Sequence, residues 1–112
     1  MGLHGFVTLP FWLAAAGADV LMAPGLPDLA AVKTVCDALE KPFSFMVGVP
    51  GRSFSKAELE ACGVRRISLA TALYRAAMGG LMAAASEALD EGTFGFVSTG
   101  ADGRALAGYM QE

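Results

Sequence analysis

Three β-strand/α-helix units in a row constrain this chain more than any other feature, because three units are too few to close a barrel. Short apolar segments at Asp19–Met22, Phe43–Val47 and Val64–Leu69 are each followed by a helix-forming segment. This alternation predicts right-handed crossovers and a parallel sheet. A closed (β/α)8 barrel needs eight units and about 250 residues, whereas the chain has 112 residues. The sequence therefore predicts an α/β fold that is either part of a barrel or a small open three-layer sheet.

Local signals predict where the helices begin and end. Pro10 suits the first position of a short helix over residues 11–16. Asp28 suits the N-cap of a helix that reaches about Glu40. Residues 55–58 form a capping-box pattern that opens the next helix. A long helix, Thr71–Asp90, is predicted after the third strand, and the tail 93–112 is only weakly patterned.

The long helix Thr71–Asp90 carries an apolar stripe made mostly of small residues, which let helices approach closely. Three parallel strands also leave two sheet edges unpaired. We therefore expect a homo-oligomer with this helix as its main interface. The stripe expected to make the contact consists of Leu73, Ala77, Gly80, Leu81 and Ala84.

Composition argues against several functional classes. The formal charge is −3, and Arg65-Arg66 is the sole adjacent basic pair, so we expect no nucleic-acid partner. No uninterrupted apolar stretch approaches the length of about 18 residues that a membrane span requires, so we expect no membrane association. Cys36 and Cys62 lack the spacing of a metal or redox motif. The sequence thus predicts a cytoplasmic protein with free thiols.

The Gly48–Ser53 loop follows the second strand and carries Arg52 between a glycine and a serine. Loops after the last strands of a barrel often hold phosphate or carboxylate groups. Weak substrate-binding candidates are therefore Ser44, Gly48, Gly51 and Arg52. A simple turn remains the favoured interpretation of the loop, and a hydrogen bond from the Ser44 hydroxyl to the backbone is as good a reading as a bond to a substrate.

Arg65 and Arg66 lie at the start of the third strand. That end of a barrel contributes to stability, whereas the opposite end carries the catalytic groups. The two arginines are therefore interpreted as members of structural ion pairs.

Four segments resemble the isocitrate lyase/phosphoenolpyruvate mutase family, in its phosphonomutase-like, oxaloacetate-decarboxylase-like or methylisocitrate-lyase-like branch. They are residues 16–28, 41–42, 61–69 and 91–96. The resemblance covers about residues 14–96 of a single partial-barrel domain (1–112), with a divergent N-terminus (1–13) and a C-terminal tail (97–112). Close relatives have an asparagine where this chain has Ser44, and some members have a glutamate where it has Pro24.

The resemblance implies that the three strands are the sixth, seventh and eighth of a (β/α)8 barrel. It also implies a Mg²⁺-dependent lyase or mutase that acts on C–C or P–C bonds of small 2-oxo acids. The family's acidic Mg²⁺ ligands lie on earlier strands, so this chain contains no metal ligand and no catalytic residue, and the isolated chain should be inactive. In the family, the helix after the eighth strand is commonly exchanged between subunits.

Two non-enzymatic alternatives remain open. The chain could be a truncated paralogue that lends its long helix and apolar sheet edge to a full-length partner. It could also be a small α/β binding module that uses the Gly48–Ser53 loop.

Overall fold

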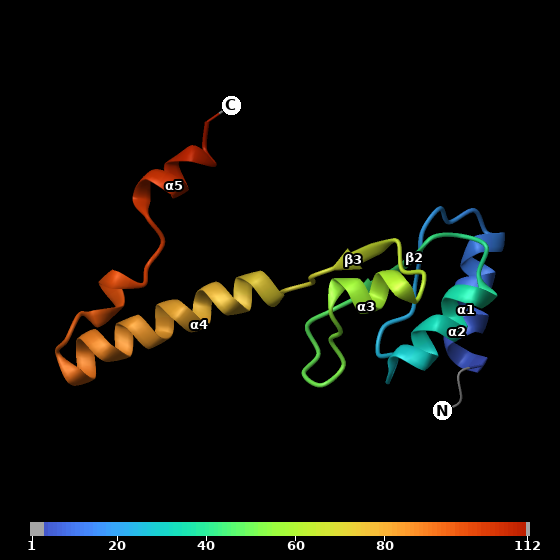
Figure 1. The fold of residues 1–112 in the computed structure, drawn as a ribbon, viewed down its shortest axis with the longest axis horizontal. Coiled ribbons are helices and arrows are strands. Elements are labelled where there is room, and N and C mark those ends of the chain that lie inside the picture. Colours follow the sequence, from blue (N-terminus) through green and yellow to red (C-terminus); the bar gives the residue numbers. More distant parts are fainter. Residues whose placement is uncertain (1–3, 112) are drawn as a thin grey trace. The chain divides into compact units, whose positions relative to one another are not determined.

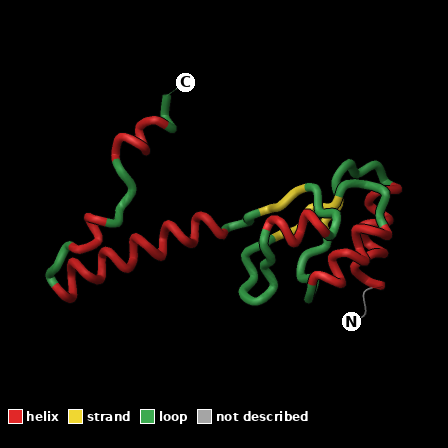
Figure 2. Tube along the Cα trace, in the orientation of Figure 1, coloured by secondary structure: helices red, strands yellow, loops and turns green. Residues whose placement is uncertain are grey.

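The computed structural model describes residues 4–111. The chain divides into two compact units, residues 1–73 and 74–112. The first unit contains β-strands and helices, whereas the second consists of helices joined by turns (Figure 2). Among the described helices, none is long and apolar enough to cross a membrane.

The first unit is built on a parallel sheet of three strands in sequence order. α2 (Leu29–Ala38) connects the first two strands and α3 (Lys56–Ala61) connects the second two, as Figure 1 shows. The fold class is therefore confirmed as three consecutive βα units with parallel strands, an arrangement that fits part of a (β/α)8 barrel. The strands are β1 (Leu21–Met22), β2 (Phe43–Met46) and β3 (Arg66–Ser68).

The hydrophobic core lies between one face of the sheet and its helices. Phe43 and Phe45 share a face of β2, because side chains alternate along a strand, and they are 1% and 3% exposed. α1 (His4–Ala15) contacts β1 and lies beside α2 (Figure 1). The central strand thus carries the apolar side chains on which the helices pack. The buried hydrophobic residues are Leu21, Ala23, Leu26, Ala31, Val32, Val35, Phe43, Phe45, Leu59 and Val64.

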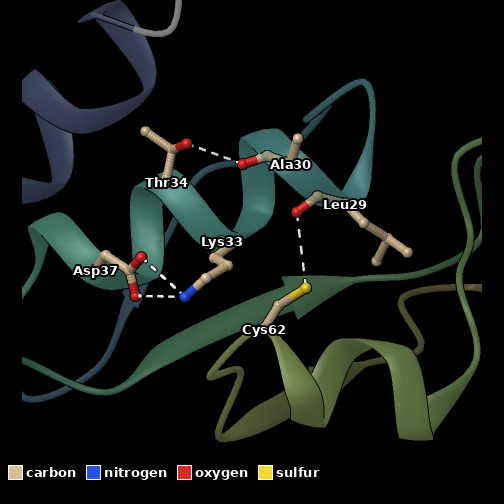
Figure 3. Close-up of polar contacts among 6 residues, drawn as sticks. All are labelled: Leu29, Ala30, Lys33, Thr34, Asp37 and Cys62. Atoms are coloured by element: carbon tan, nitrogen blue, oxygen red, sulfur yellow. Dashed lines mark hydrogen bonds and ion pairs between the residues drawn. The ribbon is translucent and has the colours of Figure 1, made fainter.

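α2 begins where the sequence predicts and presents the predicted polar face. The Asp28 side chain caps the helix by accepting a hydrogen bond from Ala31 N at 2.8 Å. Lys33, Thr34 and Asp37 are exposed on the outer surface, where Lys33 Nζ lies 3.0 Å from Asp37 Oδ2 (Figure 3). This ion pair has i, i+4 spacing, but water surrounds both side chains, so it stabilises the helix only weakly.

α3 opens with the predicted capping box. Ser55 Oγ accepts from Glu58 N at 3.2 Å, and Glu58 Oε2 accepts from Ser55 N at 2.8 Å. Hydrogen bonds from the backbone and then the side chain of Ser55 to the carboxylate lower the pKa of Glu58. The helix ends at Ala61, and Gly63 then adopts φ +100°, a left-handed conformation that glycine accepts without strain.

The first helix differs from its prediction. It begins at His4 and continues to Ala15, so Pro10 lies inside it and does not open it. An internal proline removes one backbone hydrogen bond and is costly in a helix. Pro10 is nevertheless one of the most deeply buried residues of the chain. Burial of its ring offsets the lost hydrogen bond, a compensation that no local signal indicates.

The second helix and all three strands are shorter than predicted. α2 ends at Ala38 and does not reach Glu40. The strands lose residues 19–20, 47, 64–65 and 69 from their predicted ranges. The outer strands can pair only where β2 offers partners: Leu21 lies opposite Phe43, and Leu21 N already donates to Pro42 O. Pro42 has no N–H to extend the ladder, so the paired region stops there.

The second unit contains most of the predicted long helix. α4 (Ala72–Ser86) continues into η1 (Glu87–Glu91), a single π-helical turn, so the helix spans the predicted Thr71–Asp90 almost completely. The tail is better ordered than its weak pattern indicates, since it forms η2 (Gly95–Ser98) and α5 (Gly103–Gly108). No residue described between 74 and 111 is buried, so this unit has no core of its own.

A carboxylate closes the turn that follows the long helix. Glu87 Oε1 accepts hydrogen bonds from Gly95 N at 2.6 Å and from Thr93 Oγ1 at 2.9 Å, and Oε2 accepts from Phe96 N at 3.3 Å. The hydrogen bonds from the backbone of Gly95 and the hydroxyl of Thr93 lower the pKa of Glu87. A Cβ on Gly95 would lie 3.1 Å from Oε1. A side chain at position 95 would therefore require the Glu87 carboxylate to shift by a few tenths of an ångström.

Replacing Glu87 with glutamine should loosen this turn. Glu87→Gln removes the charge and one acceptor oxygen, so the amide hydrogens of Gly95 and Phe96 should exchange faster with solvent at neutral pH. Because the folded-state pKa of Glu87 is lowered, its contribution should be present above its ordinary pKa of 4.5 and lost as pH falls through the lowered value. Hydrogen exchange followed by NMR measures both effects. Glu91→Gln is the control, and equal exchange in the two variants would contradict the assignment.

Candidate functional site

The loops that follow the three strands gather at one edge of the sheet. In a parallel sheet the carboxyl ends of all strands lie at the same edge, and ligands of barrel enzymes bind there. The segments that leave this edge are residues 23–27, 48–53 and 69–71. Phe54 follows the second loop and packs against Phe45, with ring centroids 5.8 Å apart. This contact anchors the returning end of the loop to the core.

Ser44 is a buried polar residue in the central strand. It is 1% exposed, and within residues 4–111 its Oγ has no hydrogen-bond partner. The bond to the backbone that the sequence left open is therefore not formed. Leaving a buried hydroxyl unpaired costs about 1–3 kcal/mol. Of the four candidates, Ser44 alone thus has a buried polar group that forms no hydrogen bond with another described residue.

Ser44 lies on the face of the sheet that does not carry the phenylalanine core. It pairs with Met22 of β1 and Arg66 of β3, and paired residues of neighbouring strands share a face. Phe43 and Phe45 occupy the opposite face. In a closed barrel the face away from the helices is the interior, so Ser44 has the position of an inward-pointing residue.

Arg52 joins the loops after the first two strands. Its Nη1 donates to Gly25 O at 3.3 Å, across 27 positions of sequence. Ser53 braces the same loop, because its Oγ accepts from Gly48 N at 2.9 Å and donates to Val49 O at 3.0 Å. The guanidinium is exposed and has further donors available for an anion.

The two candidate glycines adopt conformations that favour glycine. Gly48 has φ +122° and Gly51 has φ +74°. No neighbouring atom lies within 4 Å of a Cβ built on Gly51. The left-handed backbone, and not crowding, therefore explains glycine at position 51. The structure brings Gly48, Gly51 and Arg52 together in one loop, and no hydrogen bond between the described residues links this loop to the Ser44 side chain.

Two residues at the carboxyl end of β3, Ser68 and Ala70, were not among the candidates predicted from the sequence. Ser68 lies on the same face as Ser44, two positions beyond Arg66, and its Oγ accepts from Ala70 N at 3.3 Å. Ala70 has φ +46°, an uncommon conformation for a residue other than glycine. The alternation Arg66-Ile67-Ser68 was the signal that could have placed Ser68 on the Ser44 face. The positive φ of Ala70 has no local signal.

The interpretation of Arg65 and Arg66 as members of ion pairs does not hold within the described residues. Lys33–Asp37 is the one ion pair found between residues 4 and 111. Both arginines are exposed and lie at the amino-terminal end of β3, away from the candidate loops.

The described residues do not fit a metal site. No cluster of three or more His, Cys, Asp or Glu side chains that could hold an ion occurs between residues 4 and 111. Cys36 and Cys62 are free and half-buried, and burial raises the pKa of the Cys36 thiol, with a smaller contribution from Cys62. Cys62 Sγ instead contacts Leu29 O at 3.6 Å (Figure 3). The thiols therefore serve in the packing of α2 against α3.

Solved structures similar to this chain include proteins named as lyases or mutases. A protein named as a lyase/mutase, from Burkholderia cenocepacia J2315, is 36% identical with a TM-score of 0.88, covering 97% of this chain and 39% of that one. A protein named as a phosphonomutase from the same organism is 33% identical with a TM-score of 0.67, covering 76% of this chain and 33% of the other. This chain therefore spans well under half the length of these relatives.

A more distant structure supports the fold alone. Phosphoenolpyruvate phosphomutase from Streptomyces platensis subsp. rosaceus is 19% identical with a TM-score of 0.72, covering 94% of this chain and 37% of that one. Among curated proteins, none matches significantly. The family model described as phosphoenolpyruvate phosphomutase matches residues 12–89, which include all three βα units. The chain therefore belongs to the phosphoenolpyruvate phosphomutase family.

Proposed function

We propose that this chain supplies the carboxyl ends of three barrel strands to a Mg²⁺-dependent lyase or mutase that acts on C–C or P–C bonds of small 2-oxo acids. The observation that carries the proposal is the family match over residues 12–89, together with 36% identity to the lyase/mutase of Burkholderia cenocepacia. The order of the strands and the parallel sheet agree with that match.

In this proposal Ser44 and Arg52 contact the substrate. A hydroxyl without a partner on the barrel-interior face can donate a hydrogen bond to a carboxylate or carbonyl oxygen of the oxo acid. Arg52 would balance negative charge of the substrate from the loop above, and Gly48 and Gly51 let the backbone of that loop turn toward it.

The metal belongs to the proposed complete site and not to this chain. Because the described residues offer no cluster of ligands, no step of the reaction is assigned to an ion bound by them. The ligands would come from other barrel strands. These 112 residues by themselves should therefore be catalytically silent.

An assay of the purified chain tests this expectation. With Mg²⁺ and oxaloacetate, methylisocitrate or phosphonopyruvate, product formation should equal that of a protein-free solution with the same Mg²⁺ concentration. The protein-free sample is needed because metal ions alone accelerate reactions of oxo acids. The full-length Streptomyces phosphomutase serves as the positive control for phosphonopyruvate. Turnover above background with any substrate would contradict the proposal.

Ser44 and Ser53 should respond to alanine with opposite signs. Ser44→Ala removes an unpaired buried hydroxyl and should raise the free energy of unfolding by about 1 kcal/mol. Ser53→Ala loses two hydrogen bonds of an exposed loop and should lower the same quantity by about 0.5–1.5 kcal/mol. Denaturant titrations of both variants at one protein concentration measure the difference. A destabilised Ser44→Ala variant would show that the hydroxyl has a structural partner.

A second, non-enzymatic role is favoured by the second unit. α4 has no buried residue, and Leu73 and Leu81 are 68% and 60% exposed. An isolated helix of this length is only marginally stable in water, because most helices are stabilised by packing of an apolar face. We therefore expect another polypeptide to pack against the apolar stripe. We assign this role to a second copy of the chain, with α4 as the main interface. A truncated paralogue would present the same exposed stripe to its partner.

Two neighbouring glycines provide a matched test of the interface. A Cβ at Gly79 or Gly80 would meet no atom within 4 Å, so neither position is crowded at the Cβ. Gly80 lies in the stripe, whereas Gly79 lies about 100° away around the helix. Gly80→Arg should dissociate the oligomer in light-scattering measurements, and Gly79→Arg should leave its mass unchanged. Equal masses for both variants and the unmodified chain would exclude α4 as the interface.

A further inference from the structure

The two cysteines of the chain meet where the end of α3 packs against α2. Cys36 lies in the last turn of α2, and Cys62 is the residue that caps the C-terminus of α3. A Cβ built on Gly63, the residue after Cys62, would lie 3.3 Å from Cys36 Cβ and 3.9 Å from Cys36 Sγ. The backbone next to Cys62 therefore lies directly against the Cys36 side chain.

The Cys62 side chain also lies on α2. Its Sγ contacts Leu29 O at 3.6 Å, across 33 positions of sequence (Figure 3). Leu29 and Cys36 are about two helical turns apart, so they lie on the same face of α2. Burial raises the pKa of the Cys36 thiol, and the nearby Cys62 adds to this shift. Both thiols thus occupy one face of α2, at its junction with α3.

A cavity of about 300 Å³ opens beside Cys36. Lys41, Arg65 and Glu40 share its lining with the thiol, so the cavity holds two cations and one carboxylate. Neither cation is part of an ion pair between residues 4 and 111. The volume lies at the lower end of the range for small-molecule sites. The cavity can therefore admit a small reagent to Cys36, and its charge favours an anionic one.

This cavity is distinct from the candidate functional site. Its lining includes Pro42 and Phe43 at the start of β2 and Arg65 just before β3. It therefore lies at the amino-terminal end of the strands, whereas the candidate loops leave the opposite end.

We propose that Cys36 and Cys62 form a redox-active dithiol that the disulfide of a small acidic thiol, glutathione disulfide, oxidises through this cavity. The Cys36 thiolate attacks one sulfur of glutathione disulfide, which breaks the S–S bond and releases one glutathione. The Cys62 thiolate then attacks the Cys36 sulfur of the mixed disulfide, forms the Cys36–Cys62 bond and releases the second glutathione. The two cysteines lose two electrons and two protons, and the two glutathione molecules take them up.

Rates of oxidation of the 112-residue chain by two small disulfides test the role of the cavity. Glutathione disulfide carries net negative charge, whereas cystamine is a dication. Exposed charge contacts are individually weak, so the rate of Cys36 oxidation by glutathione disulfide, relative to cystamine, should fall about tenfold in Lys41→Glu/Arg65→Glu. Arg75→Glu/Arg104→Glu in the second unit changes the net charge equally and should keep the original ratio. An unchanged ratio in the first variant would overturn the assignment of the cavity.

The product of the reaction tests the pairing of the thiols. Mass spectrometry of the fully reacted chain should show the loss of two hydrogens, no bound glutathione, and a Cys36–Cys62 crosslink within one chain. Cys62→Ser should stop at a mixed disulfide on Cys36. A mixed disulfide that persists on Cys36 of the unmodified chain, or a disulfide between two chains, would contradict the proposal.

The redox equilibrium shows whether folding brings the thiols together. In glutathione buffers, the equilibrium constant for the internal disulfide should be about a hundredfold larger for the folded chain than for the chain in concentrated urea, where a flexible loop alone joins the cysteines. Ala61→Cys/Cys62→Ser keeps nearly the same loop but turns the thiol about 100° around the axis of α3, so this variant should lose the difference. Equal constants for the unmodified chain under both conditions would show that the fold does not pair the thiols. These readouts involve no turnover, so they leave the proposed lyase or mutase function untouched.

Discussion

The pairing of β2 with both of its neighbours is the interaction on which the first unit depends. β1 contributes two paired residues and β3 contributes three. Among the described residues, neither strand pairs with any strand other than β2. The same four-residue strand carries Phe43 and Phe45, against which α2 and α3 pack. A parallel sheet is stable only when its faces are covered. The length and register of β2 therefore set the limits of both the sheet and the core.

Packing is distributed unevenly along the chain. The first unit has a contiguous cluster of buried residues, whereas no described residue between 74 and 111 is buried. Alanine gives α4 a high intrinsic helix propensity, and Glu87 fixes the turn that follows it through hydrogen bonds from Thr93, Gly95 and Phe96. Local interactions thus define the second unit, while its large apolar side chains stay exposed.

On two surfaces of the first unit, polar groups have no partner among the described residues. Inside, the Ser44 hydroxyl has no partner on the face that a barrel would enclose. At the edge, Arg65 and Arg66 have no ion-pair partner between residues 4 and 111. A self-contained domain normally satisfies its buried polar groups and protects its edge strands. Arg65 and Arg66 are exposed to solvent and need no ion-pair partner, so the unpaired Ser44 hydroxyl is the departure from this norm.

Sequence by itself determined the elements whose signals are local. Asp28 and the Ser55–Glu58 box begin their helices through hydrogen bonds that span three residues, and alternation of strands and helices set the class of sheet. The candidate loop was also visible, because its glycines and Arg52 lie in one short segment, Gly48–Ser53. Only the tertiary structure decided the lengths of the strands, the place of Pro10 inside α1 and the unpaired state of Ser44. Each depends on burial or on a backbone partner far away in sequence. The spacing of residues along the chain does not show which distant residues come into contact.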